Sequence, residues 1–150
     1  MPKQVRLADV TAANRQAVKD LKLAPDQEDL VASNAESLAD ARRNRFARPR
    51  AVYAGDELVG FLMYDAPDSA EEPDEATIYR FMIDRAQQGK GYGRAALELA
   101  LAEIRQVPGI ARIRILYMPG NDVARAFYAS LGFVEVHHDD DGEVVAELRL

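Results

Sequence analysis

Cysteine is absent from the 150 residues of this chain. Its absence excludes disulfide bonds, thiolate nucleophiles and metal sites built on cysteine. At this length a single domain buries about 68–70% of its unfolded surface, so the core needs neither a disulfide nor a metal. Hydrophobic residues make up 48% of the sequence and charged residues 29%, which is typical of a globular protein. We therefore expect one globular domain over residues 1–150.

Long apolar runs and an excess of basic residues are also missing. No apolar run approaches the roughly 18 residues of a transmembrane helix, and the first ten residues lack the apolar stretch of a signal peptide. We therefore expect a cytoplasmic protein. The formal net charge is −6, which argues against a general nucleic-acid surface because phosphate binding depends on concentrated lysine and arginine. Neither a membrane nor a nucleic acid is an expected partner.

Histidine is scarce, and its placement disfavours a metal site. The two histidines, His137 and His138, stand beside three aspartates, Asp139, Asp140 and Asp141. Adjacent residues of a strand point to opposite faces, so the two imidazoles would not converge on one ion. We interpret the segment as the charged turn of a hairpin and expect no metal.

The hydrophobic pattern alternates between the periods of strands and helices along the chain. Strands are expected at Gln4–Ala8, Ala51–Ala54, Glu57–Tyr64, Ala76–Asp84, Ile110–Tyr117, Phe133–His137 and Val144–Leu148. Helices are expected at Thr11–Leu23, Gln27–Arg43, Gly91–Gln106 and Asn121–Leu131. The acidic stretch 65–75 contains Pro67 and Pro73, which predict a loop. This order predicts a mixed α/β fold on a partly antiparallel sheet.

The junction between the fourth strand and the third helix, MIDRAQQGKGYGR at residues 82–94, is rich in glycine. Gly89, Gly91 and Gly93 alternate there with Lys90, Tyr92 and Arg94. Glycine lets a ligand approach the backbone, and the first amides of a helix have no partner within it. Together with the helix dipole they form an anion site suited to a phosphate or pyrophosphate, to which Lys90 and Arg94 add charge.

Two familiar phosphate motifs do not fit this junction. The dinucleotide-binding motif needs G-x-G-x-x-G in the first strand–helix unit, whereas the spacing here is G-x-G-x-G in the middle of the chain. The P-loop needs Ser or Thr after Gly-Lys, but Gly91 follows Lys90. A turn whose glycines serve only helix–sheet packing is the structural alternative.

Two segments resemble signatures of the GNAT N-acetyltransferase superfamily. Gln88-x-x-Gly91-x-Gly93 resembles its Q/R-x-x-G-x-G/A acetyl-coenzyme A motif. Residues 121–133, NDVARAFYASLGF, resemble its second signature, with an Asn, an aromatic pair and a terminal Gly-Phe. Their order and spacing fit over residues 50–137, and the amino-terminal part is similar to bacterial spermine/spermidine (diamine) acetyltransferases.

The resemblance implies a GNAT-like α/β (α+β) fold, with a mixed, mostly antiparallel central sheet flanked by helices and two strands splayed at the cofactor site. The backbone of residues 81–83 would pair with the pantetheine arm, and the amides of residues 89–94 would bind the pyrophosphate. Asn121 would hydrogen-bond the arm and Phe127 would pack on it, although an N-cap and a core position are their structural alternatives. The implied acetyl-CoA contacts are Phe81, Met82, Ile83, Gln88, Gly89, Lys90, Gly91, Tyr92, Gly93, Arg94, Asn121 and Phe127.

The resemblance also implies a general acid. In the superfamily a tyrosine at the position of Tyr128 commonly protonates the coenzyme A thiolate as it leaves, which a positioned phenol can do. The alternative is a packed tyrosine whose hydroxyl finds a backbone partner.

The general base is not identified by the resemblance. Many relatives carry an acidic residue on the strand before the glycine turn, but Ile78-Tyr79-Arg80 offers no carboxylate. Glu75 and Asp84, at the two ends of that strand, are the candidates. A water relay, or an amine that arrives already neutral, is the alternative.

The implied activity is transfer of acetyl from acetyl-CoA to a primary amine, with no metal. A polyamine or another small-molecule amine is the expected acceptor. The resemblance to spermine/spermidine acetyltransferases implies it, and the acidic stretch 65–75 and Asp26, Glu28 and Asp29 would attract a polycation. The alternative is that these acidic residues do not bind the acceptor and only keep exposed segments soluble. Two alternatives stay open, a protein or peptide amine acetyltransferase and a non-catalytic acyl-CoA-binding regulatory module. The sequence leaves open whether the chain forms a homodimer.

Overall fold

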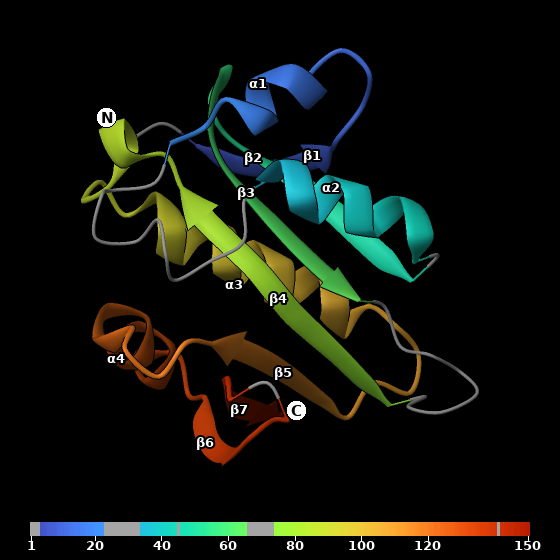
Figure 1. Ribbon diagram of the computed structural model, residues 1–150, viewed down its shortest axis with the longest axis vertical. Coiled ribbons are helices and arrows are strands. Elements are labelled where there is room, and N and C mark those ends of the chain that lie inside the picture. The colour runs from blue at the N-terminus through green and yellow to red at the C-terminus, as the bar shows by residue number, and fades with distance from the viewer. Residues whose placement is uncertain (1–3, 23–33, 45, 66–73, 141) are drawn as a thin grey trace.

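The computed structural model describes residues 4–22, 34–44, 46–65, 74–140 and 142–150 (Figure 1). These residues form one sheet of seven strands in the order β1-β2-β3-β4-β5-β7-β6. The strands are β1 (Val5–Asp9), β2 (Ala47–Ala54), β3 (Glu57–Asp65), β4 (Glu75–Ile83), β5 (Arg112–Tyr117), β6 (Val134–His138) and β7 (Val144–Arg149). The helices are α1 (Arg15–Lys19), α2 (Asn34–Arg43), α3 (Tyr92–Arg105) and α4 (Asp122–Ser130), with a short 3-10 helix, η1 (Arg85–Gln87).

The expected mixed and mostly antiparallel sheet is confirmed. β4 and β5 run parallel, whereas the other five neighbouring pairs run antiparallel. A parallel pair needs a crossover connection, and α3 supplies it between β4 and β5. The chain passes from the end of β4 through η1 and residues 88–91 to the start of α3.

Helices cover both faces of the sheet and give it two hydrophobic clusters. On one face, Val18 of α1 and Leu38 of α2 pack with side chains of β2, β3 and β4. On the other face, α3 contributes a stripe at helical spacing, Leu97, Leu101 and Ile104, to the larger cluster. None of the described helices is long and apolar enough to cross a lipid bilayer.

The expected splaying of two strands is confirmed between β4 and β5. Their pairing joins Glu75–Ile78 to Arg112–Ile115 and then stops, although both strands continue. Figure 1 shows the two strands diverging beyond this point. From residue 79 onward, the backbone edge of β4 on the side of β5 is therefore not paired with β5 and faces an opening.

A β-bulge lies at the same point of β4. The register with β3 passes from Met63 opposite Arg80 to Tyr64 opposite Ile78, which makes Tyr79 the extra residue. Residues three apart normally point to opposite faces of a strand. The bulge changes this phase, so Ile78 and Phe81 both contribute to the cluster under α3.

Several element boundaries differ from those expected from the sequence, most of all in β2 and in the first helix, which ends at Lys19 and not at Leu23. The first helix begins at Arg15 and not at Thr11, because Asn14 accepts a bond from the Thr11 amide (2.8 Å) and donates to the Asp9 carbonyl (3.0 Å), which hold a turn there. β2 begins at Ala47 and includes Pro49. Pro49 is tolerated because the pairing with β1 extends only to Arg50. An N–H at position 49 would have no partner in β1, so proline costs no hydrogen bond there. Of the expected helix Gln27–Arg43, residues 27–33 lie outside the described residues.

Candidate active site

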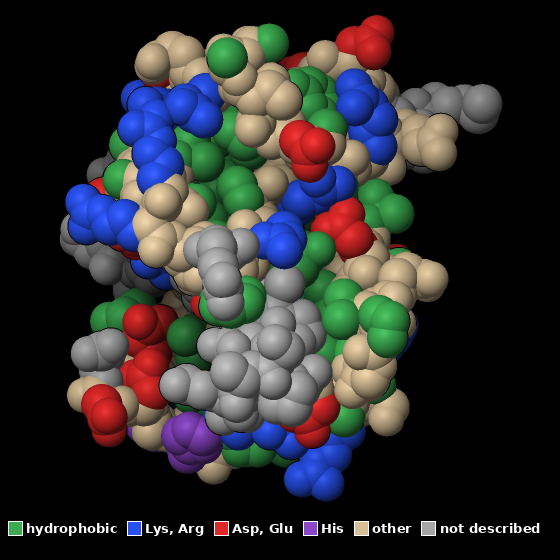
Figure 2. Space-filling view, turned by 90° about the vertical axis from the view of Figure 1, so that its right-hand side faces the viewer, with side chains coloured by type: hydrophobic (Ala, Val, Ile, Leu, Met, Phe, Trp, Pro, Cys, Tyr) green, Lys and Arg blue, Asp and Glu red, His purple; other side chains and the backbone are tan. Residues whose placement is uncertain are grey.

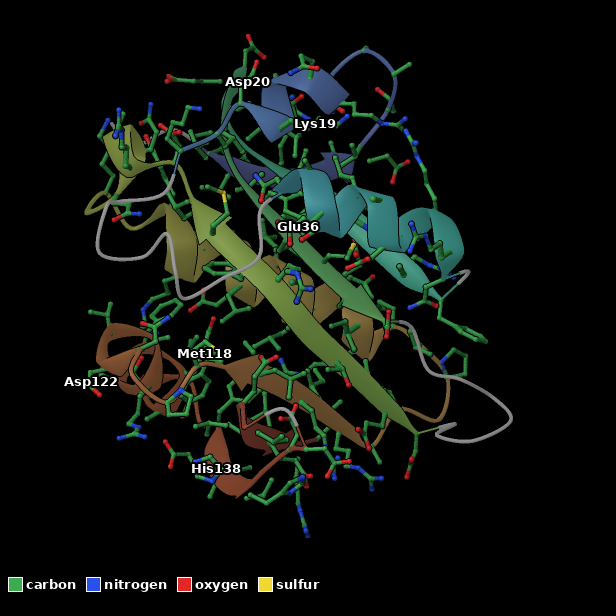
Figure 3. All side chains as sticks on the ribbon, in the orientation of Figure 1. Lys19, Asp20, Glu36, Met118, Asp122 and His138 are labelled. Atoms are coloured by element: carbon green, nitrogen blue, oxygen red, sulfur yellow. The ribbon has the colours of Figure 1, made fainter. Side chains whose placement is uncertain are left out.

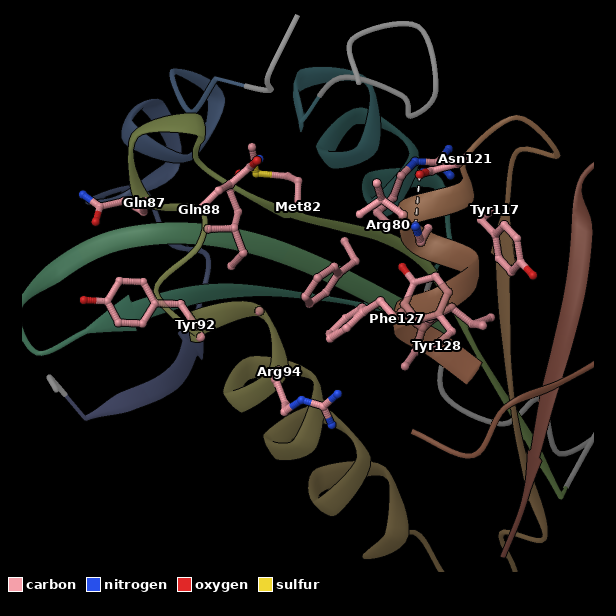
Figure 4. A pocket seen from close by; sticks show the side chains of 18 of the residues that line it. Arg80, Met82, Gln87, Gln88, Tyr92, Arg94, Tyr117, Asn121, Phe127 and Tyr128 are labelled. Carbon is pink, nitrogen blue, oxygen red and sulfur yellow. Dashed lines mark hydrogen bonds between the residues drawn. The ribbon is translucent and has the colours of Figure 1, made fainter. Parts of the chain in front are cut away.

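A cavity of about 450 Å³ occupies the opening between β4 and β5 (Figure 4). The end of β4, the glycine turn, the start of α3, the end of β5 and α4 all line it. Met118 follows β5, and the chain turns there toward Asp122 in the first turn of α4 (Figure 3). Predicted acetyl-CoA contacts that line the cavity are Phe81, Met82, Ile83, Gln88, Gly89, Gly91, Tyr92, Gly93, Arg94, Asn121 and Phe127.

Lys90 is the predicted contact that does not line the cavity. Its Nζ donates to the Gln87 side chain over 2.9 Å, and Lys90 itself is exposed. Of the two basic residues predicted to contact the cofactor, Arg94 is the one that lines the cavity.

The glycine turn offers an open backbone surface at the start of α3. Gly89 and Gly91 adopt φ values of +80° and +83°, and a Cβ added at either position would meet no atom within 4 Å. Gly91 caps α3, so the amides of Tyr92, Gly93 and Arg94 have no acceptor within the helix. Uncovered amides at the positive end of a helix fit the diphosphate of a coenzyme A.

Asp84 anchors this turn to the rest of the fold. One carboxylate oxygen accepts the Lys22 amide (2.7 Å), and the other accepts the Ala86 amide (3.2 Å) at the start of η1. The carboxylate is therefore engaged by backbone donors, and it does not line the cavity.

Phe127 and Arg94 form one wall of the cavity. The Phe127 ring lies 6.2 Å from the Phe81 ring, and the Arg94 guanidinium carbon lies 5.7 Å from the Phe127 centroid. Arg94 also donates to the Ser130 hydroxyl over 2.6 Å. These contacts fix a positive charge between α3 and α4 at the cavity.

Asn121 is the N-cap of α4, which was the structural alternative to cofactor contact, and it also lines the cavity. Its side-chain oxygen accepts the Ala124 amide over 3.1 Å and so caps α4 (Figure 4). Within the described part of the chain, its side-chain nitrogen has no hydrogen-bond partner. That nitrogen is available to donate to a bound molecule.

Tyr128 is held by aromatic rings and not by a hydrogen bond. Its ring lies 5.6 Å from both Tyr117 and Phe127 and 6.1 Å from Phe133, and the residue is only 6% exposed. Among the described residues its hydroxyl has no hydrogen-bond partner, and Figure 4 shows it directed toward the β4 side of the cavity. Burial raises the pKa of Tyr128 above its ordinary value, so the hydroxyl keeps its proton near neutral pH.

Neither carboxylate suggested as a base is brought to the cavity. Glu75 lies at the opposite end of β4, where it pairs with Arg112 (3.0 Å) and Arg114 (3.3 Å) of β5. Asp84 is engaged at the turn, as described above. No Asp or Glu of the described ranges lines the cavity.

Arg80 occupies the cavity wall where the resemblance would place an acidic side chain. Its Nε donates to the buried Ser37 hydroxyl of α2 (2.9 Å), and its Nη2 lies 3.7 Å from Asp40. A positive charge fixed there cannot accept a proton from the amine. The structure therefore offers no side-chain base at this position.

Several residues that line the cavity were not identified as cofactor contacts from the sequence motifs. They are Ile78, Arg80, Gln87, Ile115, Leu116, Tyr117, Val123 and Ala124. The alternation of β5 gives a signal for two of them, because Ile115 and Tyr117 share the face that packs toward α3 and α4. His137 and His138 lie on β6 and do not line the cavity; Figure 3 labels His138.

Comparison with known proteins agrees with this geometry. The model of the acetyltransferase (GNAT) family matches residues 8–133. Spermine/spermidine N(1)-acetyltransferase of Bacillus subtilis is 30% identical over 132 residues, which span 86% of this chain and 87% of that protein. The ribosomal protein bS18 alanine N-acetyltransferase of Escherichia coli is 39% identical over 62 residues, 41% of each chain.

Solved structures share the fold at lower identity. An acetyltransferase from Thermus thermophilus superposes with a TM-score of 0.75 at 22% identity over the whole of both chains. An aminoglycoside acetyltransferase in complex with coenzyme A gives a TM-score of 0.80 at 14% identity, covering 97% of this chain and 95% of that one. Fold, cavity and family match agree, and the chain belongs to the GNAT family as an acetyl-CoA-dependent N-acetyltransferase.

Proposed function

We propose that the chain acetylates a small primary amine, with a polyamine as the preferred acceptor. The observation that carries this proposal is the similarity to the Bacillus subtilis spermine/spermidine N(1)-acetyltransferase, which extends over 86% of the chain. The similarity to the bS18 alanine N-acetyltransferase is confined to 41% of the chain. A small amine is therefore favoured over a peptide amine.

Acetyl-CoA supplies the reactive acetyl thioester. In the proposed complex, the amides at the start of α3 and the Arg94 side chain bind its diphosphate. The unpaired backbone edge of Phe81, Met82 and Ile83 holds the pantetheine arm, as an added strand would be held, and the side-chain nitrogen of Asn121 donates to it. Catalysis then comes mainly from placing the amine and the thioester together in one cavity.

Tyr128 is the proposed general acid. As the new C–N bond forms and the C–S bond breaks, its hydroxyl gives a proton to the departing sulfur. A positioned acid contributes a factor of roughly 10²–10⁴ to the rate. Because no described carboxylate lines the cavity, the amine loses its proton to water before or during attack.

An acceptor panel tests the proposal. Purified protein and acetyl-CoA are mixed with a thiol indicator and one acceptor at a time: spermidine, spermine, a monoamine, an amino acid, an aminoglycoside and a peptide with an amino-terminal alanine. We expect the highest kcat/KM for spermidine or spermine, with the acetylated amine identified by mass. A higher kcat/KM for the peptide or the aminoglycoside would contradict the polyamine proposal. Acetyl-CoA binding without turnover on any acceptor would indicate a non-catalytic module.

A further inference from the structure

The direction of the Tyr128 hydroxyl depends on the packing of its ring. The hydroxyl has no hydrogen-bond partner among the described residues, so its position depends on the packing of its ring, which contacts the rings of Tyr117, Phe127 and Phe133. A general acid must lie within hydrogen-bond reach of the atom that it protonates. Any loosening of these rings would therefore reduce its efficiency.

Tyr117 differs from the other two neighbouring rings because it is anchored at both ends. Its ring packs on Tyr128 at 5.6 Å, while its hydroxyl donates to the Glu135 carboxylate over 2.6 Å. Figure 4 shows the hydroxyls of Tyr117 and Tyr128 pointing away from each other, so the contact between them is through the rings. Tyr117 is thus fixed from the side opposite the cavity.

Glu135 joins three elements at this point. It lies on β6, accepts from Tyr117 of β5, and pairs with Arg125 of α4 at 2.8 Å from the arginine Nε. Arg125 lies three residues before Tyr128 on the same helix. The carboxylate therefore ties the helix that carries Tyr128 to the strand that carries the ring packed on it.

We infer that Glu135 is a positioning residue for the general acid, acting through Tyr117 and Arg125 without touching the substrates. This inference rests on the proposed role of Tyr128. Glu135 does not line the cavity and is about half-exposed on the edge strand β6. Its effect on the reaction would consequently appear in kcat and not in the binding of acetyl-CoA.

The charge of Glu135 supports this role. The hydrogen bond from Tyr117 has the largest effect and lowers the pKa of the Glu135 carboxyl. Desolvation opposes it, and the positive charge of Arg125 lowers the pKa further. The carboxylate is ionised near neutral pH, and hydrogen bonds to an ionised acceptor are shorter and stronger than neutral ones.

The test is a double-mutant cycle between Glu135 and Tyr128. We expect Glu135→Ala to lower kcat about 10- to 100-fold, since small misplacements of a reacting group have effects of this size, with little change in KM for acetyl-CoA. Glu135→Gln retains an acceptor for the Tyr117 hydroxyl and should recover most of the rate, whereas Tyr117→Phe should behave like Glu135→Ala. His137→Ala, on the same strand, is the control and should leave kcat unchanged.

The double variant distinguishes positioning from a general loss of structure. If Glu135 acts through the acid, adding Glu135→Ala to Tyr128→Phe should slow turnover no further, because residues that act together are not additive. Full additivity of the two effects, or a Glu135→Ala enzyme as fast as wild type, would overturn the inference. If Tyr128→Phe alone leaves kcat unchanged, the proposed acid fails instead, and the cycle reports that separately. Equal thermal midpoints of Glu135→Ala and Glu135→Gln would show that a difference in their rates does not come from unfolding.

Discussion

Gly91 combines two properties that a ligand-binding turn needs, a left-handed backbone and empty space where a side chain would be. Its φ is +83°, a region that β-branched residues almost never adopt, and nothing lies within 4 Å of a Cβ built there. Gly91→Val should therefore weaken coenzyme A binding strongly, because the new side chain would occupy the space next to the helix amides. Calorimetric titration of coenzyme A into the folded variant measures the effect.

Gly109 provides a matched control for the strain at Gly91. It has a φ of +82° and equally open surroundings, but it follows α3 and does not line the cavity. Gly109→Val should lose similar stability and keep its affinity for coenzyme A. If a folded Gly91→Val protein bound coenzyme A with unchanged affinity, the proposal that the diphosphate binds at this turn would be wrong.

At the scale of single elements, α4 depends on the cap that Asn121 supplies. Replacing such a cap by alanine costs about 1 kcal/mol of stability, within a range of roughly 0.5–2 kcal/mol. We expect this loss for Asn121→Ala, because the Ala124 amide would lose its acceptor. Denaturant unfolding without ligand measures the change.

A serine at position 121 separates the cap from the proposed ligand contact. Asn121→Ser keeps an oxygen for the Ala124 amide and should restore stability, but it lacks the side-chain nitrogen that would donate to the pantetheine arm. Its affinity for coenzyme A should stay as low as that of Asn121→Ala. Wild-type affinity in the serine variant would restrict Asn121 to capping.

Elements with strong periodicity and local motifs could be predicted from the sequence, whereas contacts between distant elements could not. The stripe of α3 and the glycine turn before it are local patterns, and both lie where they were expected. The splaying of β4 from β5 was known only from the resemblance, since no local pattern marks where their pairing stops. Glu75, a candidate base, does not line the cavity. It pairs with Arg112 and Arg114 of a strand that begins 37 residues further along the chain, and the sequence gives no local signal of such a contact.

At the scale of the whole molecule, three buried tyrosines make the free energy of unfolding depend on pH in the alkaline range. Burial raises the pKa of Tyr64, Tyr117 and Tyr128 above the ordinary value of 10, and hydrogen bonds to Glu103 and Glu135 raise the first two further. As pH rises above 10, the unfolded chain releases these phenolic protons before the folded chain does. The free energy of unfolding should therefore be constant with respect to these groups below pH 10 and fall above it.

Urea unfolding between pH 8 and pH 11 measures this fall, and phenolate absorbance of the folded protein reports the ionisation itself. Tyr64→Phe is the informative variant, because it removes one of the tyrosines whose pKa is raised, and Tyr64 does not line the cavity. Its stability should decline less steeply above pH 10 than that of the wild type. Identical slopes would show that Tyr64 ionises equally in the folded and unfolded chains.

The acidic residues that the structure describes around the stretch 65–75 are already engaged by other side chains. Asp65 accepts from Asn44, Asp74 pairs with Arg112, and Glu75 pairs with Arg112 and Arg114. Residues 66–73, and Asp26, Glu28 and Asp29, lie outside the described residues. Acidic and basic side chains are interspersed on the face that Figure 2 shows. The expected attraction of these undescribed acids for a polycation stays a prediction, and the net charge of −6 would act in the same direction.

Such an attraction predicts a specific response to salt. Spermidine carries several positive charges, so the net negative field should favour its capture more than that of a monoamine and lower its KM. Salt screens exposed charges over about 8–10 Å at ordinary ionic strength. Raising the salt concentration should therefore increase KM for spermidine more than for a monoamine, with kcat unchanged for both because the reacting atoms lie inside the cavity. Steady-state kinetics of the two acceptors at low and high salt measure the difference, and equal responses would leave the polyamine preference without electrostatic support.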